Sequence, residues 1–194
     1  MFLKIIYHQP IRQQSLNGAS GYAIEIGDSS NTPLEKIYIA NVVFENNALG
    51  GILINGPTNG SPLAYAVENN TFVNGISGIT LDVPVSPATT SNIRNNIFAG
   101  QSLVPIQIVA VDDGGVEYSY NLFYDCVNGD CATGWHAGSL NATSSAHDNL
   151  FDLAPLFADP DDGNYHLLSD SPAIDAGDPA ITYEAGAIDG DGDG

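Results

Sequence analysis

One short phrase recurs along the chain and limits the folds open to it. Phe returns five times in a similar polar setting, at Phe44, Phe72, Phe98, Phe123 and Phe151, with spacings of 28, 26, 25 and 28 residues. A unit of this length is too short to bury an apolar face by itself. A nearly fixed period therefore indicates units that stack on one another and share a continuous core.

Asn residues accompany Phe in two columns. Two residues before Phe stand Asn70, Asn96, Asn121 and Asn149, and three residues before it stand Asn41, Asn69 and Asn95, followed by Tyr120 and Asp148. Asn tolerates the left-handed backbone of a tight corner, and its amide can bond the equivalent Asn of neighbouring units. We expect Asn ladders at the corners and an internal Phe stack with a spacing of about 4.8 Å. Recurrence in nearly every unit favours this interpretation over a row of glycan contacts.

A second block shows that the units contain β-strands. It reads GILING from Gly51, GITLDV from Gly78 and PIQIVAV from Pro105, with an earlier relative, YAIEIGD, from Tyr22. Apolar residues alternate with mostly polar ones, which is typical of a half-buried strand, and no helical period occurs. Leucine-rich repeats would need a Leu ladder, and propeller blades would need about 40 residues. An all-β parallel β-helix, with one unit per coil, is the remaining candidate.

The coil sequences resemble a known family. ENNTF, RNNIF and GITLDV, within the stretch from Tyr22 to Phe151, are similar to the coils of the pectate-lyase-like superfamily of single-stranded right-handed parallel β-helix proteins. The resemblance implies a right-handed solenoid of about five coils over residues 1–157. That fold hosts lyases, hydrolases, adhesins and inert spacers, so the resemblance does not select an activity.

The repeat pattern of the sequence ends at Phe151. PLFADP, NYHL and SPAIDAGDP resemble a C-terminal segment of large bacterial secreted or surface β-helix proteins that carry varied cell-surface anchors ("choice-of-anchor" proteins). The resemblance implies that residues 158–194, with an acidic Gly-Asp tail, form an irregular cap. The apolar residues expected to cover the last coil are Leu156, Phe157, Tyr165, Leu167, Ala173 and Ile174. Both chain ends suggest a piece of a longer protein, and MFLKIIYHQP is not a convincing signal peptide. We expect an extracellular or cell-surface location.

The charge is strongly negative and uneven. The net charge is −19, and all four Lys and Arg residues lie in the first 103 positions, whereas residues 104–194 hold 17 of the 23 acids. Such a surface repels phosphate backbones and anionic membranes, which excludes nucleic acids as partners. The sequence contains no run of 18 apolar residues, so it predicts no membrane-spanning helix.

Two local motifs suggest a cation site and a disulfide. The last six residues alternate Asp and Gly, with carboxylates at Asp189, Asp191 and Asp193, and this spacing suits a Ca²⁺ loop. A flexible acidic tail is the alternative interpretation of the same residues. The bidentate Glu of an EF-hand is missing. Cys126 and Cys131 flank an Asn-Gly turn, so a local disulfide is geometrically feasible and weakly favours an oxidising compartment; two free thiols are the alternative.

Candidate catalytic residues are sparse. A uronate lyase needs a cationic group and a base, but the coils contain only Lys36 and Arg94. A glycoside hydrolase needs two carboxylates, and the best set is Asp82, Asp112 and Asp113, although Asp-Asp-Gly-Gly is also an ordinary turn. Arg94 and Trp135 are weak ligand-binding candidates, and a solvated Arg and a buried Trp anchor are their plainer interpretations.

Three functions remain open on the sequence. The favoured one is a non-catalytic extracellular module, a rigid structural, adhesive or glycan-facing element of a bacterial secreted or cell-surface protein. The alternatives are a polysaccharide lyase or glycoside hydrolase domain using the three Asp residues, and a self-assembling subunit that pairs at its open coil ends. The expected partners are a polysaccharide or another copy of the chain, and Ca²⁺ is the one cofactor expected.

Overall fold

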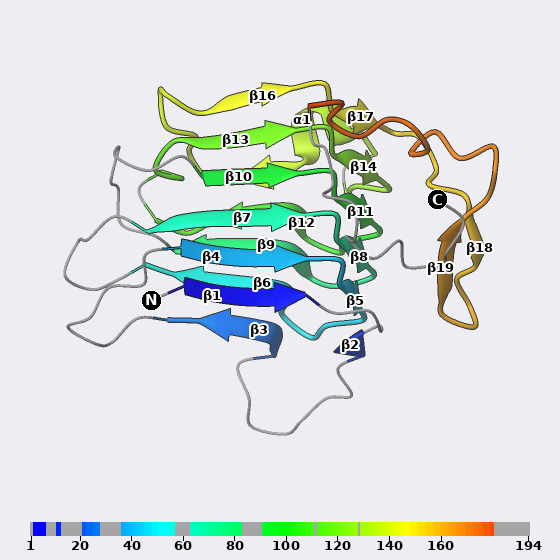
Figure 1. The fold of residues 1–194 in the computed structure, drawn as a ribbon, viewed down its shortest axis with the longest axis horizontal. Coiled ribbons are helices and arrows are strands. Elements are labelled where there is room, and N and C mark those ends of the chain that lie inside the picture. Colours follow the sequence, from blue (N-terminus) through cyan, green and yellow to red (C-terminus); the bar gives the residue numbers. More distant parts are fainter. Residues whose placement is uncertain are drawn as a thin grey trace.

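The fold is a parallel β-solenoid with almost no helix, as predicted, and its winding is consistent with a right-handed β-helix (Figure 1). This computed structural model describes residues 2–6, 11–12, 21–27, 36–56, 63–82, 91–110, 112–127 and 129–180. The solenoid has about four turns, slightly fewer than the five expected. Three strands near the ends of the solenoid are only two residues long: β2 (Ile11–Arg12), β15 (His136–Ala137) and β17 (Leu150–Phe151).

Three parallel sheets form the sides of the solenoid. The first sheet contains β1 (Phe2–Ile6), β4 (Lys36–Ala40), β7 (Ala64–Glu68), β10 (Ser91–Arg94), β13 (Val116–Ser119) and β16 (Ser145–His147). The second sheet contains β2, β5 (Val43–Glu45), β8 (Thr71–Val73), β11 (Ile97–Ala99), β14 (Leu122–Tyr124) and β17. The third sheet contains β3 (Tyr22–Ile26), β6 (Gly50–Asn55), β9 (Ser77–Asp82), β12 (Val104–Ile108) and β15.

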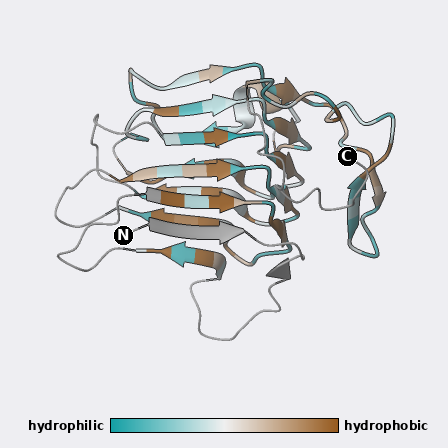
Figure 2. Cartoon of the chain, viewed as in Figure 1, coloured by the Kyte–Doolittle hydropathy of each residue, from teal (hydrophilic) through white to brown (hydrophobic). Residues whose placement is uncertain are grey.

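Like residues stack on like residues inside the solenoid. The register pairs Phe44 with Phe72, Phe72 with Phe98 and Phe98 with Phe123, and their ring centroids lie 4.7, 4.8 and 5.1 Å apart. Phe151 continues the stack at 5.6 Å. Figure 2 shows hydrophobic and hydrophilic residues alternating along strands of the first sheet, which is the pattern of a strand with one face in the core. The spacing between coils therefore places the rings in direct stacking contact.

The two Asn columns have different structural roles. Residues three before Phe adopt the left-handed conformation at the corner between the first and second sheets, with φ of 59° at Asn41, 57° at Asn69, 56° at Asn95, 55° at Tyr120 and 53° at Asp148. Asn is enriched in this conformation because its short polar side chain can bond locally. These residues turn the chain; they do not form the buried ladder.

The residues two before Phe form that ladder. Nδ2 of one Asn donates to Oδ1 of the next, at 3.0, 3.0 and 3.1 Å for Asn70–Asn96, Asn96–Asn121 and Asn121–Asn149. The same Oδ1 atoms accept from the backbone N–H of the preceding Asn, and Nδ2 also donates to backbone carbonyls of the preceding coil. Each corner thus satisfies backbone groups that the turn removes from the sheets.

A disulfide and a Trp complete the core near the last coil. Cys126 and Cys131 are bonded, with Cα atoms 5.3 Å apart, and Cys131 begins the single-turn helix α1 (Cys131–Gly134). Trp135 follows and is only 6% exposed. Its ring contacts Tyr118 at 4.9 Å and Phe123 at 5.5 Å. The segment therefore inserts a large apolar side chain beside the aromatic stack.

The C-terminal segment leaves the parallel ladder after β17. β18 (Phe157–Asp159) and β19 (Asn164–Leu167) form an antiparallel pair, which lies beside the strands of the second sheet (Figure 1). Residues 168–180, here called the strap, return toward the corner that carries Asn95. No helix within the described ranges is long and apolar enough to cross a membrane.

Candidate functional site: a groove between the strap and the second sheet

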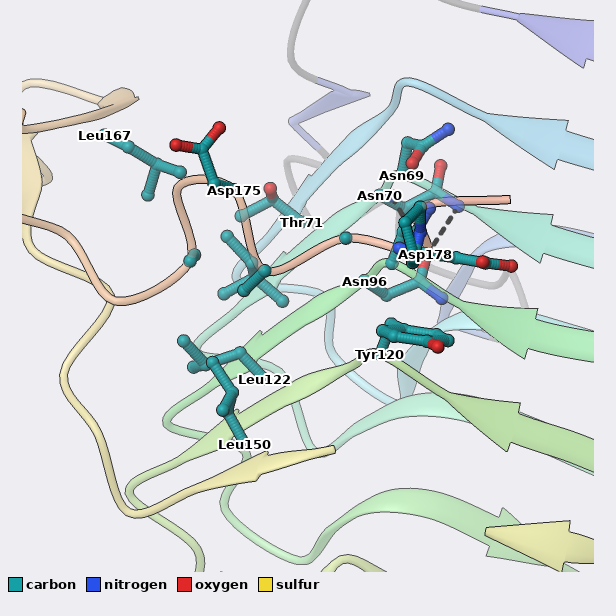
Figure 3. A pocket seen from close by; sticks show the side chains of 16 residues that line it. Asn69, Asn70, Thr71, Asn96, Tyr120, Leu122, Leu150, Leu167, Asp175 and Asp178 are labelled. Carbon is teal, nitrogen blue, oxygen red and sulfur yellow. Dashed lines mark hydrogen bonds between the residues drawn. The ribbon is translucent and has the colours of Figure 1, made fainter. Parts of the chain in front are cut away.

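A groove of about 480 Å³ lies between the strap and the outer face of the second sheet (Figure 3). Three sets of residues line it: the corner column, the outward-facing residues of the second sheet, and the C-terminal segment. They include Asn69, Asn95 and Tyr120 from the corners, Thr71, Ile97, Leu122 and Leu150 from the sheet, and Leu167, Ala173 and residues 175–179. The groove thus joins residues that are up to 110 positions apart in the chain.

The floor of the groove is mainly aliphatic. Thr71, Ile97, Leu122 and Leu150 occupy the same register position in four successive strands. This position immediately precedes the inward-facing Phe, so alternation along the strand points it outward. Leu122 is nevertheless only 2% exposed. The C-terminal segment therefore removes part of this aliphatic column from water and leaves a groove where the contact is incomplete.

The strap is anchored by ionic and backbone contacts at one corner. The Arg94 guanidinium lies 2.9 Å from Glu68 Oε1 through Nε and 3.1 Å from Asp178 Oδ2 through Nη1. The backbone N–H of Asp178 donates to Asn95 Oδ1 at 2.9 Å. The side chains of Glu68 and Asp178 are 8% and 11% exposed, so these contacts are largely shielded from water. A single guanidinium, that of Arg94, therefore pairs with two carboxylates, Glu68 and Asp178.

The polar groups that line the groove differ in their access to water. Nδ2 of Asn69 is buried without a hydrogen-bond partner. The exposed Asp175 carboxylate has no cation or donor among the residues that the structure describes. The pKa of Tyr120 is raised by desolvation, by the charges of Asp148 and Asp178 and by a hydrogen bond to Asp148, so Asp148 already engages its hydroxyl.

The catalytic candidate Asp113 lies outside the groove and is buried. It is 1% exposed, and its carboxylate accepts four hydrogen bonds, from the Tyr118 hydroxyl (2.8 Å), the Ser144 hydroxyl (2.6 Å) and the backbone N–H groups of Asn141 (2.8 Å) and Gly115 (3.3 Å). Four donors match the acceptor capacity of an ionised carboxylate. Asp113 therefore ties the loop around Asn141 to the coil, and its oxygens do not face an open cleft.

The other two Asp candidates do not join it in a paired acid arrangement. Asp112 accepts from the Gly114 N–H and from Asn141 Nδ2, both at 2.9 Å, so it stabilises the same turn. Asp82 is exposed at the end of β9, in register with Asn55 of the preceding coil. Asp112 and Asp113 therefore lie in one turn, and both carboxylates accept hydrogen bonds that hold this turn to the segment around Asn141.

The two ligand-binding candidates have defined contacts. Trp135 is buried against the aromatic stack, so its face is unavailable for a sugar ring. Arg94 lies beside the groove, yet Glu68 and Asp178 occupy its guanidinium. The proposed calcium residues Asp189, Asp191 and Asp193 lie outside the described residues, and no group of three or more metal-ligating side chains occurs within them.

Sequence reasoning missed the groove because its two walls share no repeat. One signal was present: Tyr120 occupies a corner position held by Asn or Asp in the other coils, and a bulky residue with positive φ is uncommon. A second signal was the acidic sequence of the strap. Arg94 is the one Lys or Arg whose side chain the structure describes, and it pairs with Asp178 of the strap.

Comparison with protein-family models, curated proteins and solved structures finds no match to this chain. The resemblance to pectate-lyase-like coils and to anchor-bearing surface proteins therefore rests on the residue patterns.

Proposed function

We propose that the chain is a non-catalytic extracellular module of a bacterial secreted or cell-surface protein, and that it acts as a rigid element with a glycan-facing side. One observation carries the proposal: Asp113, one of the three catalytic candidates, is buried and saturated by four donors. A general acid or nucleophile must instead reach the substrate and exchange a proton.

Rigidity is supported by the two internal ladders. The Phe rings and the Asn amides connect each coil to the next through stacking and through side-chain and backbone hydrogen bonds. Because every coil contacts only its neighbours, a continuous ladder makes the solenoid a stiff rod. The Cys126–Cys131 bond supports an oxidising, extracellular setting.

The proposal is tested by assaying the chain for turnover. Polygalacturonate, alginate and neutral glucans and mannans are incubated with the protein, with and without Ca²⁺. Unsaturated products report lyase chemistry and new reducing ends report hydrolysis. We expect neither. Turnover that disappears in Asp112→Asn or Asp82→Asn would establish the enzyme alternative, because neither side chain is buried and the fold should tolerate both changes.

Self-assembly is a second candidate, favoured by the edge at β16. Ser145, Ala146 and His147 are all exposed, and no other strand of the described chain pairs with the outer side of β16. An open strand edge can pair with another chain. Sedimentation velocity over a range of concentrations would then show association that Ser145→Lys abolishes, because an edge charge opposes strand pairing. A monomer at all concentrations would exclude it.

A further inference from the structure

We propose that copies of this chain join head to tail, with the first coil of one copy adding to the last coil of another as a continuation of the same solenoid. The partner is a second copy of the chain, and the two surfaces that meet are different ones. Such a heterologous joint does not close when successive copies continue along one axis, so it yields a rod of many copies. This inference rests on the self-assembly candidate above and identifies the surfaces that meet and their polarity.

Both ends of the solenoid present strand edges without a partner. Within the described residues, no strand pairs with the outer side of β1 or β2 at one end, or of β16 or β17 at the other (Figure 1). An unpaired edge is a template for a further strand. The third sheet ends one coil earlier, at β15, so the first and second sheets make the joint.

The last coil leaves part of the core uncovered. Ala146 continues the inward column of Ile93 and Tyr118, which are fully buried, yet Ala146 itself is exposed. Phe151, the last ring of the stack, is only half-buried, whereas Phe123 below it is buried. An apolar interior that ends beside an unpaired strand edge suits the addition of a further coil.

The first coil supplies apolar residues at the matching register positions. Ile5 belongs to the same column as Ala146, through five successive strand pairings. Ile11 belongs in the same way to the column of Phe151. When β1 and β2 of one copy follow β16 and β17 of another, both apolar columns continue across the joint as they do between coils of one chain.

Charge favours the joining of opposite ends. β1 and β2 contain Lys4 and Arg12 and no acid, whereas residues 104–194 hold 17 acids and no Lys or Arg. Two C-terminal ends would bring like negative charges together, and two N-terminal ends would bring the basic strands together. Head-to-tail joining instead opposes unlike charges. It places Lys4 of one copy at the register position next to Ser145 of the other.

The direction of the backbone groups identifies variants that block one end at a time. The carbonyl oxygens of Arg94, Ser119 and His147 accept hydrogen bonds from the preceding coil. Neighbouring residues of a strand direct their backbone groups to opposite sides, so the Ala146 N–H faces the open edge of β16. Ile6 shares the column of His147, so its N–H faces the open edge of β1. Ala146→Pro and Ile6→Pro therefore each remove one outward donor and no ladder bond within the chain.

Mixing these two variants tests the polarity. Sedimentation velocity of the full chain over a range of concentrations should show wild-type species that lengthen with concentration, and electron microscopy should show rods. Ala146→Pro alone and Ile6→Pro alone should each be monomeric, because every copy then lacks the same end. An equimolar mixture should form a 1:1 heterodimer and nothing larger, since only one pair of compatible ends is present.

A charge exchange tests the same joint without Pro. Ser145→Lys places a cation opposite Lys4 of the neighbouring copy, and Lys4→Glu places an acid against the acidic end. Each change should weaken the association constant about tenfold or more, and the double variant should recover most of the loss. Gln107→Lys adds the same charge as Ser145→Lys on β12, away from the edges that join, and should leave association unchanged. Circular dichroism and melting temperatures establish that each variant is folded.

Each result decides the proposal. A heterodimer in the mixture, with monomers in each variant alone and recovery in the double charge variant, supports it. A wild-type chain that stays monomeric, a mixture without heterodimer, or equal losses in the single and double charge variants overturns it. Dimers of either Pro variant alone also overturn it, because the joint would then pair like ends, although self-assembly itself would stand. Failure of the proposed non-catalytic role has a different readout, polysaccharide turnover, so the failures are distinguishable.

Discussion

At the residue scale, the Asn ladder makes the sharpest stability prediction. Asn96 is 1% exposed and bonds both Asn70 and Asn121 through its amide. Asn96→Ala leaves several buried donors and acceptors without partners, so we expect a loss of about 3 kcal/mol in the free energy of unfolding. Urea denaturation measures it. The control Asn46→Gly, at an exposed left-handed corner, should cost less than about 1 kcal/mol; equal losses would contradict a special role for the ladder.

The pKa values of two His residues should lie on opposite sides of the ordinary histidine pKa. Burial lowers the pKa of His136, partly offset by the charge of Asp113. A hydrogen bond to Asp148 raises the pKa of the exposed His147. NMR of the imidazole protons should show His136 titrating below about 6.5 and His147 above it. The reverse order would contradict the packing described here.

The pH dependence of stability follows from these directions. Between about 6.5 and the lower folded pKa of His136, the unfolded chain binds more protons, so the His136 contribution to stability falls as the pH falls through that window. His147 acts in the opposite sense: its contribution is complete below about 6.5 and is lost as the pH rises through its higher folded pKa. Because His147 is exposed, solvent screening keeps its effect small.

At the element scale, the third sheet depends on glycines that face the Phe stack. A Cβ at Gly78 would lie 2.6 Å from two carbons of the Phe98 ring and 2.8 Å from the Pro105 carbonyl oxygen. The ring is held between its neighbours in the stack, so it cannot move aside. We expect Gly78→Ala to destabilise the protein by about 3 kcal/mol through overpacking. Gly27→Ala is the control, because its Cβ would lie at an ordinary 3.8 Å from Asn55.

Thermal denaturation of both variants measures the difference. The expected result is a clearly lower melting temperature for Gly78→Ala and a near-unchanged one for Gly27→Ala. Similar behaviour of the two variants would mean that the Phe column can shift to accept the extra methyl group.

The coils were predictable from the sequence because each contact in them is repeated. The alignment of the Phe and Asn positions encodes the register itself, so periodicity leads directly to the stack and the ladder. The strap carries no such signal. Its attachment at Asn95 and Arg94 spans more than 80 residues and occurs once. A single long-range contact leaves no period in the text, and the groove that it creates was missed for that reason.

The acidic candidates show a second limit of sequence reasoning. Asp112 and Asp113 stand next to each other before Gly-Gly, which suits either a turn or an acid pair. The partners that decide between them, Asn141 and Ser144, belong to the following coil. Burial and hydrogen bonding of a carboxylate are properties of the folded neighbourhood, whereas its position in the chain shows only that it is available.

At the scale of the whole molecule, net charge should make stability depend on salt. Residues 104–194 hold 17 acids and no Lys or Arg, so compact folding concentrates like charges. We expect NaCl to raise the melting temperature, because screening weakens this repulsion most where charges are exposed.

CaCl₂ at equal ionic strength should raise it further if Asp189, Asp191 and Asp193 bind Ca²⁺ in the folded chain, since a ligand of the native state adds stability by mass action. Asp191→Asn should remove the Ca²⁺-specific increment and leave the NaCl effect intact. Scanning calorimetry measures both, and a melting temperature that does not respond to NaCl would show that the acids are already compensated within the fold.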